Sequence, residues 1–322
     1  MRDRLTITPE RYALIARVAL VAFTLIVVTG VAVRVTGSGL GCPTWPKCTE
    51  TSLYTELNTH GVIEFGNRML TGFVGFAAFA AFVGALLRRP LRRDLVRLGA
   101  LLPLGVVAQI VLGGFTVLYD LAPGLVMSHF MLSMLILVAC VTLDWRAHHE
   151  PEELTARPAP ASGDRLLTWG IRALLPLGAL AILAGTAATA AGPHTGGTGT
   201  QDIVPRLDFK GVETLNFVIE QHARIAALLG VVAVALWILA RRRGVTSADR
   251  APLTWLCGLL ALQGLVGGVQ YQLELPAEIV WLHASLAAAT WLAIVWAVVA
   301  AGQLQARTLP APGASGEAAP AR

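Results

Sequence analysis

Residues 213–240 read ETLNFVIEQHARIAALLGVVAVALWILA, a mostly apolar stretch that is long enough to cross a bilayer as one helix. A spanning helix needs about 20 such residues, and it satisfies its own backbone hydrogen bonds in lipid. Seven further apolar blocks share this property, at residues 13–35, 61–87, 95–118, 122–143, 166–191, 252–272 and 277–301. The sequence therefore predicts an all-α polytopic membrane protein with eight transmembrane helices.

The overall composition supports this fold class. The chain of 322 residues is 55% hydrophobic and 14% charged, with a mean hydropathy of +0.64. Soluble proteins carry about 25% charged residues, so a soluble enzyme is excluded. The net charge of +5 comes from arginines at the ends of the apolar blocks, where membrane topology explains them. We therefore expect a lipid bilayer around the chain and no nucleic-acid partner.

The arginines also predict the orientation of the bundle, because most of them lie on one side of it. They are Arg2, Arg4, Arg11, Arg17, Arg88, Arg89, Arg92, Arg93, Arg97, Arg146, Arg157, Arg165, Arg172, Arg241, Arg242, Arg243 and Arg250. Loops rich in Lys and Arg stay in the cytoplasm. Both termini are therefore predicted to be cytoplasmic, in a multi-pass protein of the cell (plasma) membrane.

The two halves of the chain look like copies of one four-helix unit. Gln109 is followed by Gly113 and His129, and Gln263 is followed at the same spacings by Gly267 and His283. The sequence VIE with a following Arg occurs at 62–68 and again at 218–224. We therefore expect two pseudo-symmetric four-helix bundles, related by an axis along the membrane normal. The predicted segments are an N-terminal half at 1–147, a cytoplasmic linker at 148–164, a C-terminal half at 165–302 and a disordered cytoplasmic tail at 303–322.

Three histidines, His129, His222 and His283, fall inside apolar blocks at one depth, roughly 10 to 15 Å below the outer surface. A single histidine in a membrane helix is more often a packing residue, but repetition at equivalent positions favours a ligand role. Facing helices of a four-helix bundle are a common place for a cofactor. Zinc would need more N, S or carboxylate ligands, so a heme held by His222 and His283 fits better.

The N-terminal half breaks this pattern, because its second helix has Glu64-Phe65-Gly66-Asn67-Arg68 and no histidine. His129 alone would leave one face of an iron open, which suits a substrate heme. His60 is an alternative second ligand, although a surface position explains it better. These sites are predicted to lie toward the outer leaflet.

Charged and sulfur-containing residues complete the candidate sites. Glu64 and Glu220 each precede an Arg by four residues, which indicates either an ion pair within a helix or, for Glu64, an acid–base or cation-stabilising role. Arg34, Arg68 and Arg224 at the outer boundary are candidates for binding heme propionates or, alternatively, anchors at the membrane surface. Cys42 and Cys48 in the first outer loop predict a disulfide, which is either a structural link or a redox pair.

Two motifs carry a resemblance to the heme A synthase family, in its eight-helix, actinobacterial-type form. They are TGSGLGCPTWPKC at 36–48 and IEFGNRMLTG at 63–72, together with the duplicated histidine helices. The resemblance covers nearly all of the predicted membrane portion. It implies an oxidoreductase that converts the methyl group at position 8 of heme O to a formyl group, giving heme A for cytochrome oxidase.

The resemblance also implies a role for each candidate residue. The cofactor is heme b, bound by His222, His283 and Arg224; the substrate site consists of His129, Asn67 and Arg68; Glu64 is the catalytic carboxylate; Cys42 and Cys48 form the loop pair. Heme O is the substrate, and an unidentified electron acceptor, heme O synthase and a second copy of the chain are the further expected partners.

The chain departs from the family pattern at two positions. Members usually have His immediately before the Arg in the second helix, where this chain has Asn67, and in the sixth helix that position is Ala223, one residue after His222. Two other classes of protein compete with the enzyme. A membrane b-type cytochrome for electron transfer would explain the histidines but not Glu64, and a transporter would explain the repeat but normally binds its cargo near the midplane.

Overall fold

The computed structural model describes residues 6–55, 57–150, 165–197 and 203–301. The predicted tail at 303–322 and most of the linker at 148–164 lie outside these ranges. Eight helices in the described part are long and apolar enough to cross a membrane, which confirms the predicted fold class. Their bounds are α1 (Pro9–Val35), α2 (Thr59–Leu87), α3 (Arg93–Leu118), α4 (Pro123–Ala147), α6 (Arg165–Ala191), α7 (Thr214–Arg242), α8 (Ala251–Gln272) and α9 (Ala277–Ala300), with a short 3₁₀ turn, η3 (Gly211–Glu213), before α7.

The first two helices begin at side-chain caps that the sequence supplies. The hydroxyl oxygen of Thr8 accepts a hydrogen bond from Arg11 N–H at the start of α1, and Pro9 follows at the first helical position. Asn58 Oδ1 accepts from Gly61 N–H at 2.7 Å at the start of α2. Such caps satisfy backbone donors that have no partner within the helix. The first cap sets where α1 begins, and the second sets where α2 begins after residues 36–58, the segment predicted to be the first outer loop.

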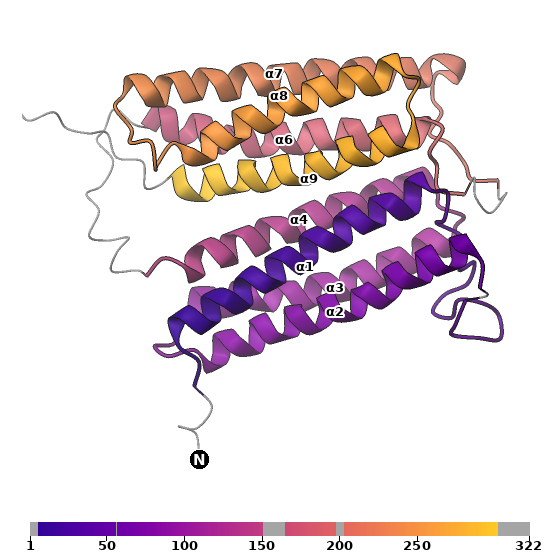
Figure 1. Ribbon diagram of the computed structural model, residues 1–322, viewed down its shortest axis with the longest axis horizontal. Coiled ribbons are helices and arrows are strands. Elements are labelled where there is room, and N and C mark those ends of the chain that lie inside the picture. The colour runs from indigo at the N-terminus through magenta and orange to yellow at the C-terminus, as the bar shows by residue number, and fades with distance from the viewer. Residues whose placement is uncertain (1–5, 56, 151–164, 198–202, 302–322) are drawn as a thin grey trace, which may run out of the picture.

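The helices form two groups, α1–α4 and α6–α9, which lie one above the other in Figure 1. Within each group every helix packs against the next one in sequence, and the first packs against the fourth. Helix α9 joins the groups because it also packs against α1 and α4, and α4 packs against α6. The beginning of α1 and the end of α9 lie at the same end of the bundle (Figure 1). Which of its ends faces the cytoplasm stays a prediction.

The two halves bury the same positions of their helices. Matching buried pairs at one constant offset are Tyr12 and Leu167, Ala16 and Ile171, Ala19 and Leu174, and Phe23 and Gly178 in α1 and α6. In α4 and α9 they are Met134 and Ala288, Leu137 and Trp291, Cys140 and Ile294, and Leu143 and Ala297. Because burial follows the face that a helix turns inward, these pairs define which residues of the two halves occupy equivalent places.

Buried positions also pair α2 with α7, and this pairing differs by one residue from the pairing of the VIE motifs. The buried pairs are Val74 and Leu229, Ala78 and Ala233, Ala81 and Leu236, and Ala85 and Ala240. At this offset His222 corresponds to Asn67, whereas the VIE motifs, which pair Glu64 with Glu220, would match it to Gly66. One residue turns a helix by about 100°, so only one of the two alignments can pair residues that both face inward. We use the pairing defined by burial below.

Candidate heme sites

In the C-terminal half, His222 of α7 and His283 of α9 face each other. Their ring centroids are 6.1 Å apart and their planes are nearly perpendicular, at 84°. His222 Nδ1 lies 2.9 Å from Ala181 O of α6. A carbonyl oxygen only accepts, so Nδ1 carries the proton and Nε2 keeps its lone pair. Metal-bound histidines are commonly oriented by such a second hydrogen bond.

Two helix glycines make room for these rings. A Cβ atom added to Gly185 would lie 3.0 Å from His222 Cε1, and one added to Gly267 would lie 3.0 Å from His283 Cε1. His283 Nδ1 is buried and has no hydrogen-bond partner among the described residues. Each imidazole is therefore packed against the backbone of a neighbouring helix, α6 or α8.

The donor set fits a heme iron between the two imidazoles. Metal–imidazole bonds are about 2 Å long, so a metal shared by two rings places their centroids about 6 Å apart, close to the separation in this structure. The described residues contain no cluster of three or more His, Cys, Asp or Glu side chains that would hold a zinc ion without a porphyrin. His222 and His283 are thus brought together as the sequence predicted, and their role as ligands stays a proposal.

In the N-terminal half, His129 of α4 is the single imidazole of the candidate site. Its Nδ1 is buried with no hydrogen-bond partner in the described ranges, and a Cβ on Gly113 of α3 would lie 3.2 Å from its Cε1. In the place that corresponds to His222 stands Asn67, whose Oδ1 lies 2.7 Å from the hydroxyl of Thr29 in α1. Sequence reasoning missed Thr29. His60, the alternative ligand, has its Nδ1 2.9 Å from Ser38 Oγ in the outer loop.

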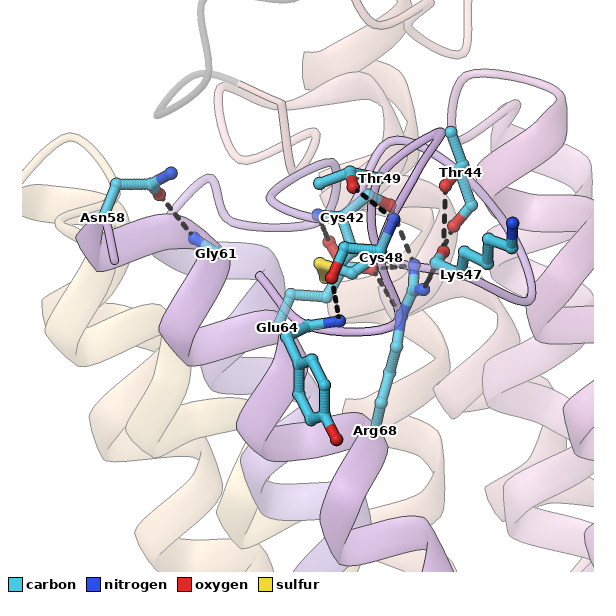
Figure 2. The surroundings of a disulfide bond; sticks show 11 residues. Cys42, Thr44, Lys47, Cys48, Thr49, Asn58, Gly61, Glu64 and Arg68 are labelled. Atoms are coloured by element: carbon cyan, nitrogen blue, oxygen red, sulfur yellow. Dashed lines mark hydrogen bonds and ion pairs between the residues drawn. A yellow bond between two sulfur atoms is a disulfide. The ribbon is translucent and has the colours of Figure 1, made fainter. Parts of the chain in front are cut away.

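Glu64 and Arg68 connect α2 to the first outer loop, where the predicted disulfide between Cys42 and Cys48 is present (Figure 2). Glu64 Oε2 accepts a hydrogen bond from Cys42 N–H at 2.7 Å, and Glu64 Oε1 accepts from Arg68 Nε at 3.0 Å. The Glu64 side chain is 8% exposed. The buried Glu64 carboxylate is therefore held between the disulfide loop and Arg68, and both Glu64 and Arg68 lie on α2, the helix that also carries Asn67.

All five N–H groups of Arg68 are used within the chain. They donate to Glu64 Oε1 from both Nε and Nη2, to Cys42 O from Nη2, and to Thr44 O and Lys47 O from Nη1. Five is the full donor capacity of an arginine. In this arrangement Arg68 positions the outer loop, and a substrate carboxylate would have to displace one of these acceptors.

The charged pair that follows the second VIE motif, in the C-terminal half, is exposed. Arg224 Nη2 lies 3.0 Å from Glu220 Oε2, and the two side chains are 68% and 62% exposed. Arg34 differs from both other arginines, because its Nε donates to His194 O of the opposite half at 3.1 Å and it has no carboxylate partner among the described residues. Within the part of the chain that the structure describes, Arg34 and Arg224 thus leave some donors without an acceptor, whereas Arg68 uses all of its donors.

Taken together, the fold and these histidines define a class of protein, an eight-helix membrane protein with an intramembrane imidazole site in each half. The described site of the C-terminal half has two imidazole rings, and that of the N-terminal half has one. The sequence model of the COX15-CtaA family, described as cytochrome oxidase assembly protein, matches residues 13–295. The chain belongs to this family.

Curated relatives agree with the family. A heme A synthase of Symbiobacterium thermophilum is 31% identical over 258 residues, which are 76% of this chain and 80% of the relative. A heme A synthase of Lysinibacillus sphaericus is 30% identical over 126 residues, which are 39% of this chain and 41% of the relative. A protoheme IX farnesyltransferase of Thermus thermophilus is 28% identical over 289 residues. That alignment covers 86% of this chain but 46% of the relative, so the chain spans less than half of it. The resemblance to heme A synthases is confirmed.

Proposed function

We propose that this protein is a heme A synthase, which oxidises the methyl group at position 8 of heme O to a formyl group and so supplies heme A to cytochrome oxidase. One observation carries the proposal: one half holds two facing imidazoles, and the other holds a single imidazole with Asn67 in the second place. Two ligands suit a resident heme, and one ligand suits a heme that enters, reacts and leaves.

The C-terminal half would hold heme b as the resident cofactor. His222 and His283 supply the two nitrogens, Ala181 O fixes the proton of His222, and Arg224 at the outer end offers an exposed guanidinium to a propionate. Heme b would supply one-electron redox chemistry when bound. The residues around it hold and orient the cofactor, and glycines at 185 and 267 leave space for the rings.

The N-terminal half would bind heme O through His129, with Asn67 and Arg68 beside it. Glu64 lies one helical turn outward of Arg68 on the same face of α2 and is the buried carboxylate of this half. We assign it the catalytic role, either accepting a proton from the substrate or stabilising a cation formed on it. Its contrast with Glu220, which is mostly exposed, supports this assignment.

The reaction requires partners that the chain itself does not provide. Conversion of a methyl group to a formyl group removes electrons and protons and adds an oxygen atom, so it needs an electron acceptor and an oxygen donor such as water. The Thermus relative is named for farnesyl transfer to protoheme, although the chain spans less than half of it. This supports heme O synthase as the partner that delivers substrate, and a second copy of the chain remains a further expected partner. We place the protein in the plasma membrane, with both sites toward the outer leaflet.

Heme analysis of membranes tests the proposal. Membranes that make heme O should accumulate heme A when this chain is expressed, and the purified chain should carry heme b. If heme O stays unchanged while heme b is bound, under conditions where another heme A synthase works, the chain is an electron-transfer cytochrome and the proposal is wrong.

The assignment of Glu64 predicts an asymmetry between two matched variants. Glu64→Gln keeps the size of the side chain and removes its charge, so heme A formation should fall at least about 100-fold, the lower range for loss of an acid–base group. Glu220→Gln should change it less than about twofold, because an exposed ion pair contributes little. Chromatography of extracted hemes measures both. Equal losses, with heme b retained in both variants, would contradict the assignment.

A further inference from the structure

The backbone carbonyl that orients His222 has an equivalent in the N-terminal half. In the offset defined by the buried pairs of α1 and α6, Ala181 corresponds to Ile26. Ala181 O accepts from His222 Nδ1, whereas Ile26 O lies 3.2 Å from the hydroxyl of Thr29. A histidine at position 67 would need this carbonyl, and the Thr29 hydroxyl, having lost Asn67 Oδ1 as its acceptor, would compete for it.

Thr29 is itself a difference between the halves. Its equivalent in α6 is Ala184, which has no hydroxyl group. The half that has His222 thus has an alanine beside the carbonyl, and the half that has Asn67 has a threonine there. Both differences lie beside equivalent backbone carbonyls, so His222 with Ala184 and Asn67 with Thr29 are two arrangements at equivalent places of the two halves.

The hydrogen bonds of this pair leave part of the Asn67 amide without a partner. The Thr29 hydroxyl has one hydrogen, and two oxygen atoms lie near it, Asn67 Oδ1 at 2.7 Å and Ile26 O at 3.2 Å. A side-chain amide has one donor end and one acceptor end, and the network decides which end faces a neighbour. Only the end facing Thr29 has a partner in the part of the chain that the structure describes, so the other end is available to a ligand.

The space beside the pair is also open. A Cβ on Gly185 would lie 3.0 Å from the His222 ring, whereas a Cβ on Gly30, the equivalent residue of α1, would meet no atom within 4 Å. The volume that an imidazole fills in the C-terminal half is therefore not filled by protein in the N-terminal half. His129 of α4, which lies against Gly113 of α3, is the single imidazole of the candidate site in this half.

We propose that Thr29 and Asn67 replace the second iron ligand and keep one axial side of the N-terminal heme open to a small ligand. Thr29 is a positioning residue: its hydroxyl, 2.7 Å from Asn67 Oδ1, fixes the amide of Asn67, and it would compete with a histidine at position 67 for Ile26 O. Asn67 presents its free amide end to whatever binds on the open side. This inference rests on the proposed function, because it requires that the N-terminal half takes up a heme through His129.

Carbon monoxide tests the proposal, because it binds a ferrous heme only where an axial side is free. The purified chain is loaded with protoheme, reduced and titrated with carbon monoxide, and heme content is measured beside it. We expect the wild-type chain to bind carbon monoxide at the heme that His129→Ala removes, and the heme of His222 and His283 to bind none. A wild-type N-terminal heme that is fully low-spin and binds no carbon monoxide would overturn the proposal.

A double variant tests the coupling between the two residues. Thr29→Ala with Asn67→His recreates the arrangement of Ala184 and His222, and it should give a low-spin N-terminal heme that has lost carbon monoxide binding. Asn67→His alone should lose less of this binding, because Thr29 still competes for Ile26 O. Thr24→Ala is the matched control, because Thr24 in the same helix donates only to Leu20 O. It should bind carbon monoxide as the wild type does.

The remaining outcomes separate the two proposals. Retained carbon monoxide binding in the double variant, with an unchanged spectrum of the C-terminal heme as evidence of folding, would overturn the pairing of Asn67 with His222. The reciprocal variant, Ala184→Thr with His222→Asn, should open the C-terminal heme to carbon monoxide, and it provides a second test if the first variant does not fold. If His129→Ala does not lower the heme content, the proposed function fails and this inference fails with it.

Discussion

At the scale of single residues, glycines position the imidazoles of the candidate sites. His222 lies against Gly185, His283 against Gly267 and His129 against Gly113. The histidines could be predicted from sequence, because an ionisable group inside an apolar helix stands out. Their supporting residues could not, since Thr29 and Ala181 belong to other helices and act through a hydroxyl group and a backbone carbonyl.

Adjacent glycines of α8 provide a matched test of this packing. Gly267→Ala would place a methyl group 3.0 Å from His283 Cε1 and must displace the ring, whereas Gly268→Ala meets no atom within 4 Å. We expect Gly267→Ala to reduce the heme content of the purified chain at least about tenfold, the lower range for a disturbed ligand environment. Gly268→Ala should retain wild-type content. Absorbance of the pyridine complex of extracted heme measures both, and equal contents would refute the packing argument.

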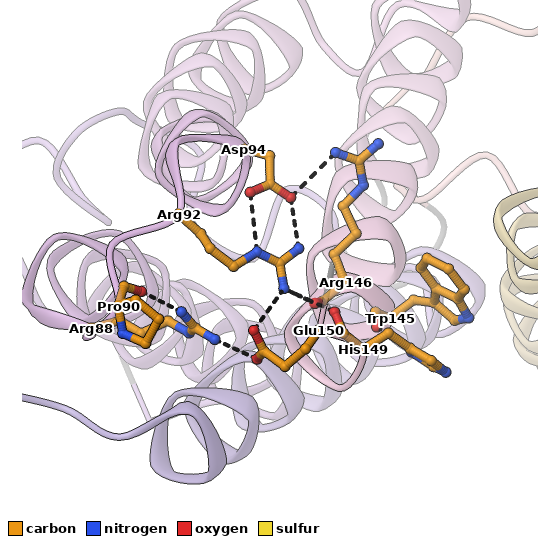
Figure 3. A network of polar contacts seen from close by, with 8 residues as sticks. All are labelled: Arg88, Pro90, Arg92, Asp94, Trp145, Arg146, His149 and Glu150. Atoms are coloured by element: carbon orange, nitrogen blue, oxygen red, sulfur yellow. Dashed lines mark hydrogen bonds and ion pairs between the residues drawn. The ribbon is translucent and has the colours of Figure 1, made fainter. Parts of the chain in front are cut away.

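At the scale of helices, a polar network ties the end of α4 to the turn between α2 and α3 (Figure 3). The Arg88 side chain is fully buried and donates to Pro90 O and to Glu150. Arg92 donates to both carboxylate oxygens of Asp94 and to the carbonyl oxygens of Arg146 and His149. The arginines at the ends of the apolar blocks predict the topology, and the structure shows that two of them, Arg88 and Arg92, also fix helix ends.

Removing the partner of the buried Arg88 should destabilise this end of the bundle. Glu150→Ala leaves a buried guanidinium without its carboxylate, which should lower the free energy of unfolding by about 3 kcal/mol. Glu50→Ala, at an exposed position of the outer loop, should change it by less than about 0.5 kcal/mol. Denaturant unfolding in detergent, followed by tryptophan fluorescence, measures the difference. A Glu150 variant as stable as the wild type would show that Arg88 finds another partner.

At the scale of the whole molecule, α9 holds the two halves together. Trp291 is 2% exposed, and its indole Nε1 donates to Met134 O of α4 at 2.9 Å. Trp281 Nε1 donates to Val28 O of α1 at 3.1 Å. Both bonds cross from one half to the other, so the halves share a packed interface and not only a covalent link.

This interface predicts that the halves assemble as separate chains. Residues 1–150 and 165–322, expressed together, should co-purify through the contacts of α9 with α1 and α4. Trp291→Phe keeps an aromatic ring but removes the donor, and it should weaken association by about 1 kcal/mol. Trp296→Phe, in the same helix and 36% exposed, is the control. Affinity capture of one tagged half measures the yield of the other, and halves that never co-purify would contradict the prediction.

The sequence by itself determined the eight helices, the Cys42 and Cys48 disulfide and the three intramembrane histidines. The physical reason is that a spanning helix is recognised from its own length and hydropathy, and a histidine within it is visible whatever its neighbours are. Only the tertiary structure decided that Asn67, and not Gly66, stands where His222 stands, that Arg68 uses all its donors on Glu64 and the first loop, and that the Thr29 hydroxyl lies between Asn67 Oδ1 and Ile26 O. These facts depend on the rotation of one helix against another, where a single residue corresponds to about 100°, and a sequence repeat read along the chain does not fix that rotation.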